Sequence, residues 1–596
     1  MDMAAASDWR DLAQGRVIPS AGYCDQPYVV KTDDGAWLCC LTTGSGHEGS
    51  PGQHVATMRS LDQGRTWSAP VKVEPDCELE NSYAVMLKAG SGRIYVFYGH
   101  NSDNVRSITS HDGKSVFTRV DSLGYYVFKY SDDHGRSWSR QRYVVPVRAF
   151  QCDRDNVYQG AIRFFWNVGR PFVHDGSAFV PLIKVGRMGA GFFAQSEGVL
   201  LRSVNLLSEV DPGKISFETL PVGDVGLRSP AGGGPIAEEQ SYVVLSDGSF
   251  CASYRGIDGY GVESYSRDGG RTWSAPQYRQ FASGRRMKNP RAANFTWKCT
   301  NGRYLYWFHN HGGHFIRDFW AHPALPAGGC TYYDDRNPAW LCGGRETDSP
   351  EGKIIVWSEP EPVLFDRDPF TGISYPDLVE EGGHYFLTET QKDIARVHEL
   401  PSAFLERIWL ELDGASPAPA PVLAIAGPAV VTAPALPPFF VRNRVGISRS
   451  GVRPGGGFSL QLELRRGAAG LLIAGLNHNG YGLAVNLNQQ RELELTLSEP
   501  WGKQVLVSPP LPEQTVAVTI LVDGGPALVS VVADGCFLDG GEDRQFGFQR
   551  LASFLRHPNW AKEWRLSEAV AMLRVFDRCL MTAECGRQRA VDDSGR

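Results

Sequence analysis

The chain has 596 residues, about four times the usual length of one domain, which excludes a single small core. Hydrophobic residues make up 42% and charged residues 21%, a balance that excludes a disordered, collagen-like or coiled-coil protein. The 60 lysines and arginines against 66 acidic residues give a net charge of −6 without a long basic run, so nucleic acid is not an expected partner.

Targeting and metal-binding signals are also missing from the sequence. No apolar stretch approaches the roughly 18 to 20 residues that span a bilayer, so no membrane partner is expected. Residues 1–16 lack the basic-then-apolar pattern of an export signal, and we therefore expect a cytoplasmic location. The 12 cysteines form no C-x-x-C pair and no His/Cys cluster with zinc-finger spacing, so neither a zinc site nor another cofactor is expected.

The phrase S-x-D-x-G-x-[T/S]-W occurs three times, at residues 60–67, 131–138 and 266–273. Its Asp and Ser side chains can bond nearby backbone amides, its Gly suits positive φ, and its Trp can pack beneath the turn, so each copy predicts a hairpin turn. The first two copies start 71 residues apart and the next two 135, about two such steps, and degraded copies stand at residues 202–217 and 356–358. Residues 17–408 thus divide into about six units. The whole chain has 66 Gly, 15 Trp and many short alternating apolar runs, a composition typical of an all-β protein. Six repeated units in such a chain predict a six-bladed β-propeller.

Strand direction predicts which polar residues meet at one end of the propeller. The first unit has strands near residues 27–31 and 37–41, a turn at 33–35 and a loop at 44–52. Because strands alternate up and down, the start of the first strand and this loop share one end, opposite the repeated turns. By the same rule the residues expected at this end, in chain order, are Asp25, His47, Glu48, Glu80, His100, Lys184, Arg187, Glu238, Glu239, Arg255, Arg291, His309, His311, Tyr375, Asp377, Glu389 and Lys392. A ring of ionisable groups in a concave mouth is typical of carbohydrate sites, so we expect a carbohydrate substrate.

The composition changes after residue 412. We assign residues 1–412 to the propeller and the Ala/Pro-rich residues 413–438 to a stiff linker. Alternating apolar runs return at 458–464 and 516–522, and the ending at 572–584 resembles the last strand of laminin-G-like, concanavalin-A-type sandwiches. Residues 439–596 therefore predict a β-sandwich, which either binds sugar or supports the propeller.

The repeated phrases resemble the Asp boxes, or BNR repeats, of the sialidase (neuraminidase) superfamily over residues 17–408. Asp boxes also occur in non-catalytic propellers and other glycosidases, so they imply the fold and little else. Two segments resemble the family in more detail. Residues 239–255 are similar to the strand that carries a catalytic Glu and a substrate-binding Arg, and residues 374–389 to the last blade with its nucleophilic Tyr.

This resemblance implies Tyr375 as nucleophile, Glu239 as the base that takes its proton, and Arg255 as a substrate ligand. A phenol with a pKa near 10 is a weak nucleophile unless a neighbouring carboxylate accepts its proton. The alternative is that Tyr375 and Glu239 form a structural hydrogen bond between two blades. His309, His311 and His314 lack an obvious carboxylate partner, so sugar hydrogen bonding is favoured over a metal site.

The sequence departs from the sialidase pattern where three arginines would hold the substrate carboxylate. The first arginine stands in an Arg-Ile-Pro phrase in the family, and here residues 24–27 read Cys-Asp-Gln-Pro. Asp25 would repel a carboxylate, so we expect a substrate other than ordinary sialosides. Arg336 and Arg345 are both possible as the third arginine. For the proton donor, an Asp in the family, this chain offers His47 or Glu48, with Asp25 nearby.

Three functions remain open from the sequence. The first is an exo-acting glycoside hydrolase, retaining if Tyr375 is the nucleophile, or in a variant of it a true sialidase. The second is a polysaccharide lyase, in which His47, His311, Tyr375 and Arg255 would act as acid, base and uronate ligand. The third is a lectin-like propeller without turnover, which the density of carboxylates disfavours. The sequence does not set the oligomeric state.

Overall fold

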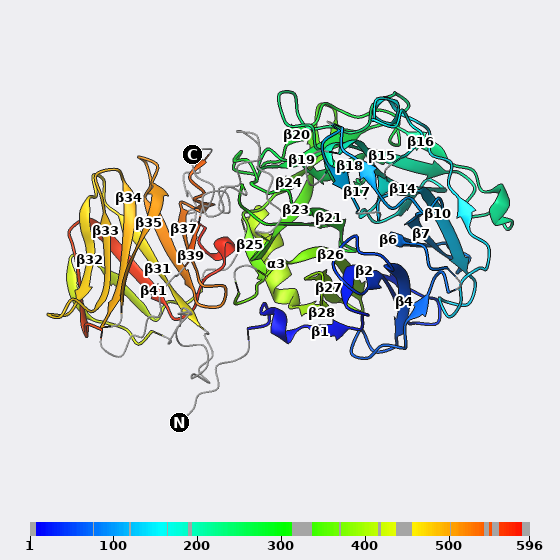
Figure 1. The fold of residues 1–596 in the computed structure, drawn as a ribbon. Helices are drawn as coiled ribbons and strands as arrows, with labels where there is room; N and C mark the ends of the chain where they lie inside the picture. Colours follow the sequence, from blue (N-terminus) through cyan, green and yellow to red (C-terminus); the bar gives the residue numbers. More distant parts are fainter. Residues whose placement is uncertain are drawn as a thin grey trace.

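The fold is that of a computed structural model. It describes residues 8–75, 77–111, 113–118, 121–163, 165–188, 193–312, 336–368, 371–414, 419–436, 456–500, 502–541, 548–550 and 560–586. Strands dominate these residues. Six antiparallel sheets follow one another along the first part of the chain, and two larger sheets follow them. The six sheets surround a common centre at the right of Figure 1, and the other two lie at the left. The predicted all-β fold, a six-bladed propeller followed by a sandwich, is confirmed.

The blades are numbered in chain order. Blade 1 contains β2 (Tyr23–Lys31), β3 (Trp37–Gly44), β4 (His54–Ser60) and β5 (Val71–Lys72), and blade 2 contains β6 (Asn81–Lys88), β7 (Ile94–His100), β10 (Tyr125–Ser131) and β11 (Tyr143–Val144). Blade 3 contains β12 (Phe165–Trp166), β13 (Phe172–His174), β14 (Ser177–Met188), β15 (Phe193–Ser203) and β16 (Glu218–Leu220). Blade 4 contains β17 (Glu238–Val244), β18 (Phe250–Arg255), β19 (Gly261–Ser266) and β20 (Gln277–Tyr278). Blade 5 contains β21 (Phe295–Lys298), β22 (Tyr304–Phe308), β23 (Ala339–Ser349), β24 (Gly352–Trp357) and β25 (Glu361–Leu364).

Blade 6 closes the ring with strands from both ends of the propeller. It contains β26 (Ser374–Glu381), β27 (His384–Thr390) and β28 (Ala395–Leu400), and its outer strand is β1 (Arg16–Ile18). β1 pairs with β28 with Val17 opposite Arg396. Backbone hydrogen bonds across this pair tie residues near the start of the chain to the last blade, so the two ends of the propeller are joined at this seam. Smaller elements lie outside the blades: η1 (Leu12–Gln14), β8 (Ile108–Thr109), β9 (Val116–Phe117), α1 (Gln151–Arg154) and η2 (Pro212–Lys214).

The three repeated phrases form the same turn in three blades. In the second copy the Ser131 hydroxyl accepts from the Gly135 amide at 2.8 Å, and Asp133 accepts from the Ser137 amide at 2.9 Å. Gly135 takes the expected positive φ, 79°, and the matching glycines of the other two copies have φ of 77° and 87°. The degraded copy in blade 3 keeps part of the pattern, because Asn205 accepts from the Ser216 amide at 3.0 Å.

Among the described residues, the two sheets of the sandwich contain 13 strands. One contains β29 (Leu423–Ala426), β41 (Val570–Phe576), β31 (Gly457–Leu464), β36 (Ala517–Asp523), β37 (Leu528–Ala533), β38 (Cys536–Phe537) and β39 (Phe548–Arg550). The other contains β30 (Ala429–Thr432), β40 (Glu563–Leu566), β32 (Gly470–Leu476), β33 (Gly482–Leu487), β34 (Glu492–Glu499) and β35 (Gly502–Pro510). Leu460, Val485 and Val575 are among the fully buried residues between the sheets.

Part of the expected linker at 413–438 forms β-strands in the structure. Its residues 423–432 form β29 and β30, one edge strand for each sandwich sheet. The segment is Ala/Pro-rich overall, but it contains two four-residue runs of β-branched and aliphatic residues. These runs pair with strands of the sandwich because its sheets offer open edges. The helix α3 (Ser402–Leu412) precedes them and packs on blade 5, where the Trp409 indole donates to the Tyr304 carbonyl at 2.9 Å.

Polar contacts join the propeller to the sandwich. Arg10 pairs with Asp523 at 2.7 Å, and the Lys288 ammonium donates to the Asp539 carbonyl at 2.7 Å. Near η5 (Thr582–Glu584), the Thr582 hydroxyl donates to the Pro360 carbonyl at 3.1 Å. In the part of the chain that the structure describes, no helix is long and apolar enough to cross a membrane.

The glycine of each Asp box also sets the distance between blades. A Cβ built on Gly135 of blade 2 would lie 2.5 Å from the side chain of Leu38, a buried residue of blade 1. Gly135→Ala should therefore lower the free energy of unfolding by about 2–4 kcal/mol, from overpacking added to the cost of positive φ. The measurement is equilibrium denaturation of the propeller.

Gly269→Ala is the matched control, since Gly269 also has positive φ, 71°, but a Cβ there meets no atom within 4 Å. It should cost about 1 kcal/mol. Equal losses for the two variants would show that blade spacing does not depend on Gly135.

Candidate active site

Four blades share one distortion of the first strand, at the same end. The ladders β2–β3, β6–β7, β17–β18 and β26–β27 each contain a bulge near the start of the inner strand. Within each bulge one residue has left-handed backbone angles: Gln26, Tyr83, Glu239 and Tyr375, with φ of 57°, 59°, 60° and 46°. Such angles are costly for residues other than glycine, and they persist where the surrounding structure enforces them, often at functional sites. The predicted nucleophile and its predicted base are two of the four.

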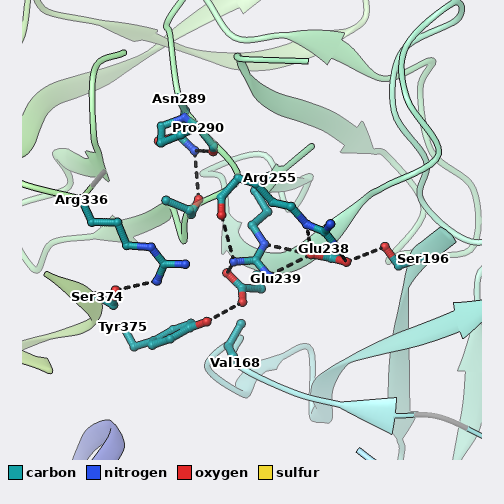
Figure 2. A network of polar contacts seen from close by, with 12 residues as sticks. Val168, Ser196, Glu238, Glu239, Arg255, Asn289, Pro290, Arg336, Ser374 and Tyr375 are labelled. Carbon is teal, nitrogen blue, oxygen red and sulfur yellow. Dashed lines mark hydrogen bonds and ion pairs between the residues drawn. The ribbon is translucent and has the colours of Figure 1, made fainter. Parts of the chain in front are cut away.

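Tyr375 and Glu239 meet at the centre of the propeller. The Tyr375 hydroxyl donates to Glu239 Oε1 at 2.9 Å, and the two side chains come from opposite sides of the contact in Figure 2. Both are buried, with 6% and 1% of their surface exposed. Burial and the negative charge of Glu239 raise the pKa of Tyr375 to about 12, so the phenol is protonated at neutral pH. Burial also raises the pKa of Glu239, against the lowering effect of Arg255.

Two arginines and one further carboxylate, Glu238, stand behind this pair. Arg255 contacts Glu239 Oε2 through Nη1 at 3.0 Å and Glu238 Oε2 through Nη2 at 2.8 Å. Arg291 reaches Glu238 Oε1 through Nη2 at 2.6 Å. Glu238 is fully buried, and burial opposes its ionisation, but Arg291 and Arg255 outweigh burial and hold the pKa of Glu238 below its ordinary value. Glu238 is therefore the ionised partner of both arginines.

Arg336 approaches from the other side of Tyr375. Its Nη1 donates to the Ser374 hydroxyl at 2.6 Å, and its guanidinium carbon lies 5.9 Å from the centre of the Tyr375 ring. Arg336 is thus the predicted third arginine that reaches the pair, whereas Arg345 lies elsewhere and contacts Asp413 at 3.2 Å. His309 is fully buried nearby. Burial, with the charge of Arg336, lowers the pKa of His309 well below its ordinary value, so its ring is neutral.

Lys392 links the pair to the outer residues of the site. It follows β27 and lies with its ammonium 4.3 Å from the centre of the Tyr375 ring. The same ammonium contacts Asp25 Oδ2 at 2.7 Å and Glu48 Oε2 at 3.3 Å. Burial works against the charge of Lys392, yet Asp25 and Glu48 raise its pKa above the ordinary value. Lys392 and Glu48 each keep 29% of the side chain exposed, so the cluster extends from solvent to the buried phenol.

Tyr83, a third member of the set with left-handed angles, holds two carboxylates together. Its hydroxyl lies 3.1 Å from Glu48 Oε1 and 2.5 Å from Asp121 Oδ2. Tyr83 has one hydroxyl proton, and its oxygen lies within hydrogen-bond distance of both carboxyl groups. The sequence analysis placed Lys392 at this end of the propeller without giving it a role, and it did not single out Tyr83 or Asp121. Only the repeated bulge marks Tyr83, and a bulge leaves no signal in a single sequence.

A family model described as a BNR repeat-like domain matches residues 35–387, most of the six blades. The chain belongs to this family. The expected relation to Asp-box propellers is thereby confirmed. No curated protein matches the sequence.

Solved structures similar to this BNR repeat chain include three with low identity. The intramolecular trans-sialidase of Ruminococcus gnavus, in complex with oseltamivir carboxylate, is 15% identical over 68% of this chain and 99% of its own, with a TM-score of 0.43. The Trypanosoma rangeli sialidase, in complex with sialic acid, is 13% identical over 95% and 92%, with a TM-score of 0.41. A Dyadobacter fermentans protein of unknown function is 15% identical over 64% and 96%, with a TM-score of 0.42. At such identities the chemistry must be argued from the residues of this chain.

Some predicted site residues of this BNR repeat propeller lie outside the cluster. His47 is exposed, and its ring lies 3.4 Å from the Ser50 hydroxyl. Asp377 is buried and lines a cavity with Val29 and Arg170, where it accepts from the Val29 amide at 2.9 Å and pairs with Arg170 at 3.1 Å. Glu389 is buried against His398 at 3.2 Å.

His311 is buried after β22, and His314 lies outside the described residues. Among the described residues no group of three or more His, Cys, Asp or Glu could hold a metal ion.

The contact of Lys392 with Asp25 gives a prediction for stability. Burial raises the folded-state pKa of Asp25 and Lys392 opposes this rise, so Lys392→Met should raise the pKa further. A carboxyl with a raised folded-state pKa favours folding below its unfolded pKa and loses that contribution as the pH rises through the folded pKa. The variant should thus lose about 1–3 kcal/mol of unfolding free energy near pH 7 and less near pH 4, as equilibrium denaturation at the two pH values would show.

Lys392→Arg keeps the charge and is the control. A loss for Lys392→Met that is the same at both pH values would mean that Asp25 and Glu48 do not depend on this cation.

Proposed function

We propose that this protein is a glycoside hydrolase in which Tyr375 is the nucleophile and Glu239 is its base. The observation that carries the proposal is the 2.9 Å hydrogen bond from the Tyr375 hydroxyl to Glu239 Oε1, between two residues held in left-handed backbone angles. A phenol with a pKa of about 12 needs a base to attack at neutral pH, and the carboxylate it needs is already in contact.

The reaction proceeds in two displacements at the anomeric carbon. In the first, a bond forms from the Tyr375 oxygen to this carbon, the phenol proton passes to Glu239, and the glycosidic C–O bond breaks. The leaving oxygen takes a proton from an acid of the site. In the second, the same acid, now deprotonated, takes a proton from water as the water oxygen adds to the anomeric carbon, the Tyr375–sugar bond breaks, and the phenol regains its proton from Glu239. Two displacements at one carbon retain its configuration.

The contacts of Glu48 favour it over His47 as the proton donor. Glu48 contacts Lys392, which lies over the Tyr375 ring, and it shares the Tyr83 hydroxyl with Asp121. It is also partly exposed, so it can exchange protons with water between turnovers. His47 points to solvent and its ring lies near Ser50. The lyase alternative, which uses His47 beside Tyr375, therefore has less support from the geometry.

Substitution of the pair tests the proposal. The wild type, Tyr375→Phe and Glu239→Gln are incubated with a panel of aryl glycosides and uronate-containing oligosaccharides, and released aglycone and near-ultraviolet absorbance are followed together. Glu239→Gln should lower kcat/KM by roughly 10²–10⁴-fold, the contribution of a positioned base, and Tyr375→Phe by at least as much. Proton NMR of the first product should show retention.

Tyr385→Phe is the matched control, because Tyr385 lies in β27 of the same blade and packs against Trp409, away from Glu239. It should leave kcat/KM unchanged. Full hydrolysis by Tyr375→Phe would sink the proposal, and rising absorbance without aglycone release would show a lyase.

The pH profile gives a second test. Glu239 acts as base only when ionised, and burial raises its pKa above the ordinary 4.5, so kcat/KM should fall on the acid side at a pH above 4.5. Arg255 lowers this pKa. Arg255→Met should therefore move the acid limb to higher pH, whereas Arg255→Lys should move it less. An acid limb that stays in place in Arg255→Met would assign the limb to another group.

A further inference from the structure

An internal carboxylate, that of Glu238, pairs with two arginines of the site, Arg255 and Arg291. Both oxygens of Glu238 are engaged: Oε1 accepts from Arg291 at 2.6 Å and from the Ser196 hydroxyl at 3.1 Å, and Oε2 accepts from Arg255 Nε at 3.0 Å and Arg291 Nε at 3.2 Å. Figure 2 shows this carboxylate enclosed beside Glu239 and Arg255. Glu238 is 0% exposed, and both arginines are buried too. To bind Arg255 and Arg291, a carboxylate from solution would have to displace the carboxylate of Glu238, which is part of the chain.

Besides Arg336, which bonds the Ser374 hydroxyl, the second cation at the Tyr375 ring is Lys392, and it is paired with carboxyl groups. Lys392 contacts Asp25 at 2.7 Å and Glu48 at 3.3 Å, so it brings one positive charge to two carboxyl groups. Glu239 adds a further carboxylate at the phenol. Like charges at such distances in a buried site repel strongly, because the effective dielectric constant is far below that of water. A sugar carboxylate bound beside Tyr375 would meet this repulsion.

We infer that Glu238 determines the class of substrate: by holding Arg255 and Arg291 it makes the site select an uncharged sugar and reject a sugar that carries a carboxylate. The inference rests on the proposed glycosidase function in so far as it calls the bound sugar a substrate. The charge selection itself is a binding property. It also gives Glu238 a positioning role, since the arginine that it holds contacts Glu239. Sugar hydroxyl groups can bond the surrounding carboxylates as donors, whereas a carboxylate can only accept.

The test is binding of carboxylates at equilibrium, which needs no turnover. Wild type and Glu238→Ala are titrated calorimetrically with sodium acetate, at an ionic strength held constant with chloride. Removing the internal carboxylate leaves a buried slot between two arginines, so Glu238→Ala should bind acetate at least about tenfold more tightly than wild type. Glu238→Ala/Arg291→Met should lose this binding, which would place the acetate at Arg291. Wild type should show no saturable binding of acetate, glucuronate or N-acetylneuraminate.

Glu218→Ala is the matched control. Glu218 also contacts two arginines, Arg202 at 2.9 Å and Arg271 at 3.5 Å, but it is 40% exposed on the outer strand of blade 3. Solvent screens this pair, so Glu218→Ala should bind acetate no better than wild type. If Glu238→Ala does not fold, Glu238→Gln replaces it, and acetate binding should again exceed that of wild type because one negative charge is gone.

Two results would overturn the inference. One is a folded Glu238→Ala or Glu238→Gln that binds acetate no better than wild type. The other is saturable binding of glucuronate or N-acetylneuraminate to wild type that Arg291→Met abolishes. Neither result depends on whether Tyr375 hydrolyses a glycoside, so this inference and the proposed function can fail separately.

Discussion

Charged side chains buried at the axis of the propeller need partners, and the chain supplies many of them from other blades. Glu239 of blade 4 accepts from Tyr375 of blade 6, Lys392 of blade 6 pairs with Asp25 of blade 1, and Arg170 of blade 3 pairs with Asp377 of blade 6. A buried charge without a partner costs several kcal/mol, so these contacts are strong constraints on how the blades sit. The site thus exists only when the ring is closed, which makes the seam between β1 and β28 a condition for the chemistry.

The repeated bulge is a feature of the backbone, whereas the residue within it differs from blade to blade. The same left-handed residue near the start of the inner strand is Gln26, Tyr83, Glu239 or Tyr375 in four blades. The backbone therefore presents four positions of one kind at the centre, and the residue type at each decides its role. Gln26 at the blade 1 position donates to the Asn167 carbonyl at 2.8 Å and ties two blades, whereas Tyr375 and Glu239 contact each other.

The fold and part of the site could be predicted from the sequence. The three Asp boxes specify their own turns through local hydrogen bonds, so they are readable without tertiary contacts, and their spacing gives the blade number. Strand alternation placed Asp377 at the mouth with Tyr375. The bulge between Ser374 and Asp377 breaks this alternation, and Asp377 instead lines a cavity with Val29 and Arg170. The same irregularity in β17 brings Glu238 and Glu239 to one arginine, although regular pleating would separate them. Lys392 and Asp121 gain their meaning only from contacts with residues distant in sequence.

The charge around Tyr375 also explains why a phenol suits this position. Glu238, Glu239, Asp25 and Glu48 already bring carboxyl groups to the centre, and a further carboxylate as nucleophile would add charge where the dielectric constant is low. A protonated phenol adds none. In the proposed reaction, the phenol proton moves to Glu239 as the new C–O bond forms, so the negative charge leaves Glu239, none remains on the phenol oxygen, and the buried pair becomes neutral. The raised pKa of Glu239 assists this transfer, because burial makes its carboxylate a stronger proton acceptor than one in water. Burial of Tyr375 and Glu239 costs folding free energy, and the same burial makes the proton transfer between them less unfavourable.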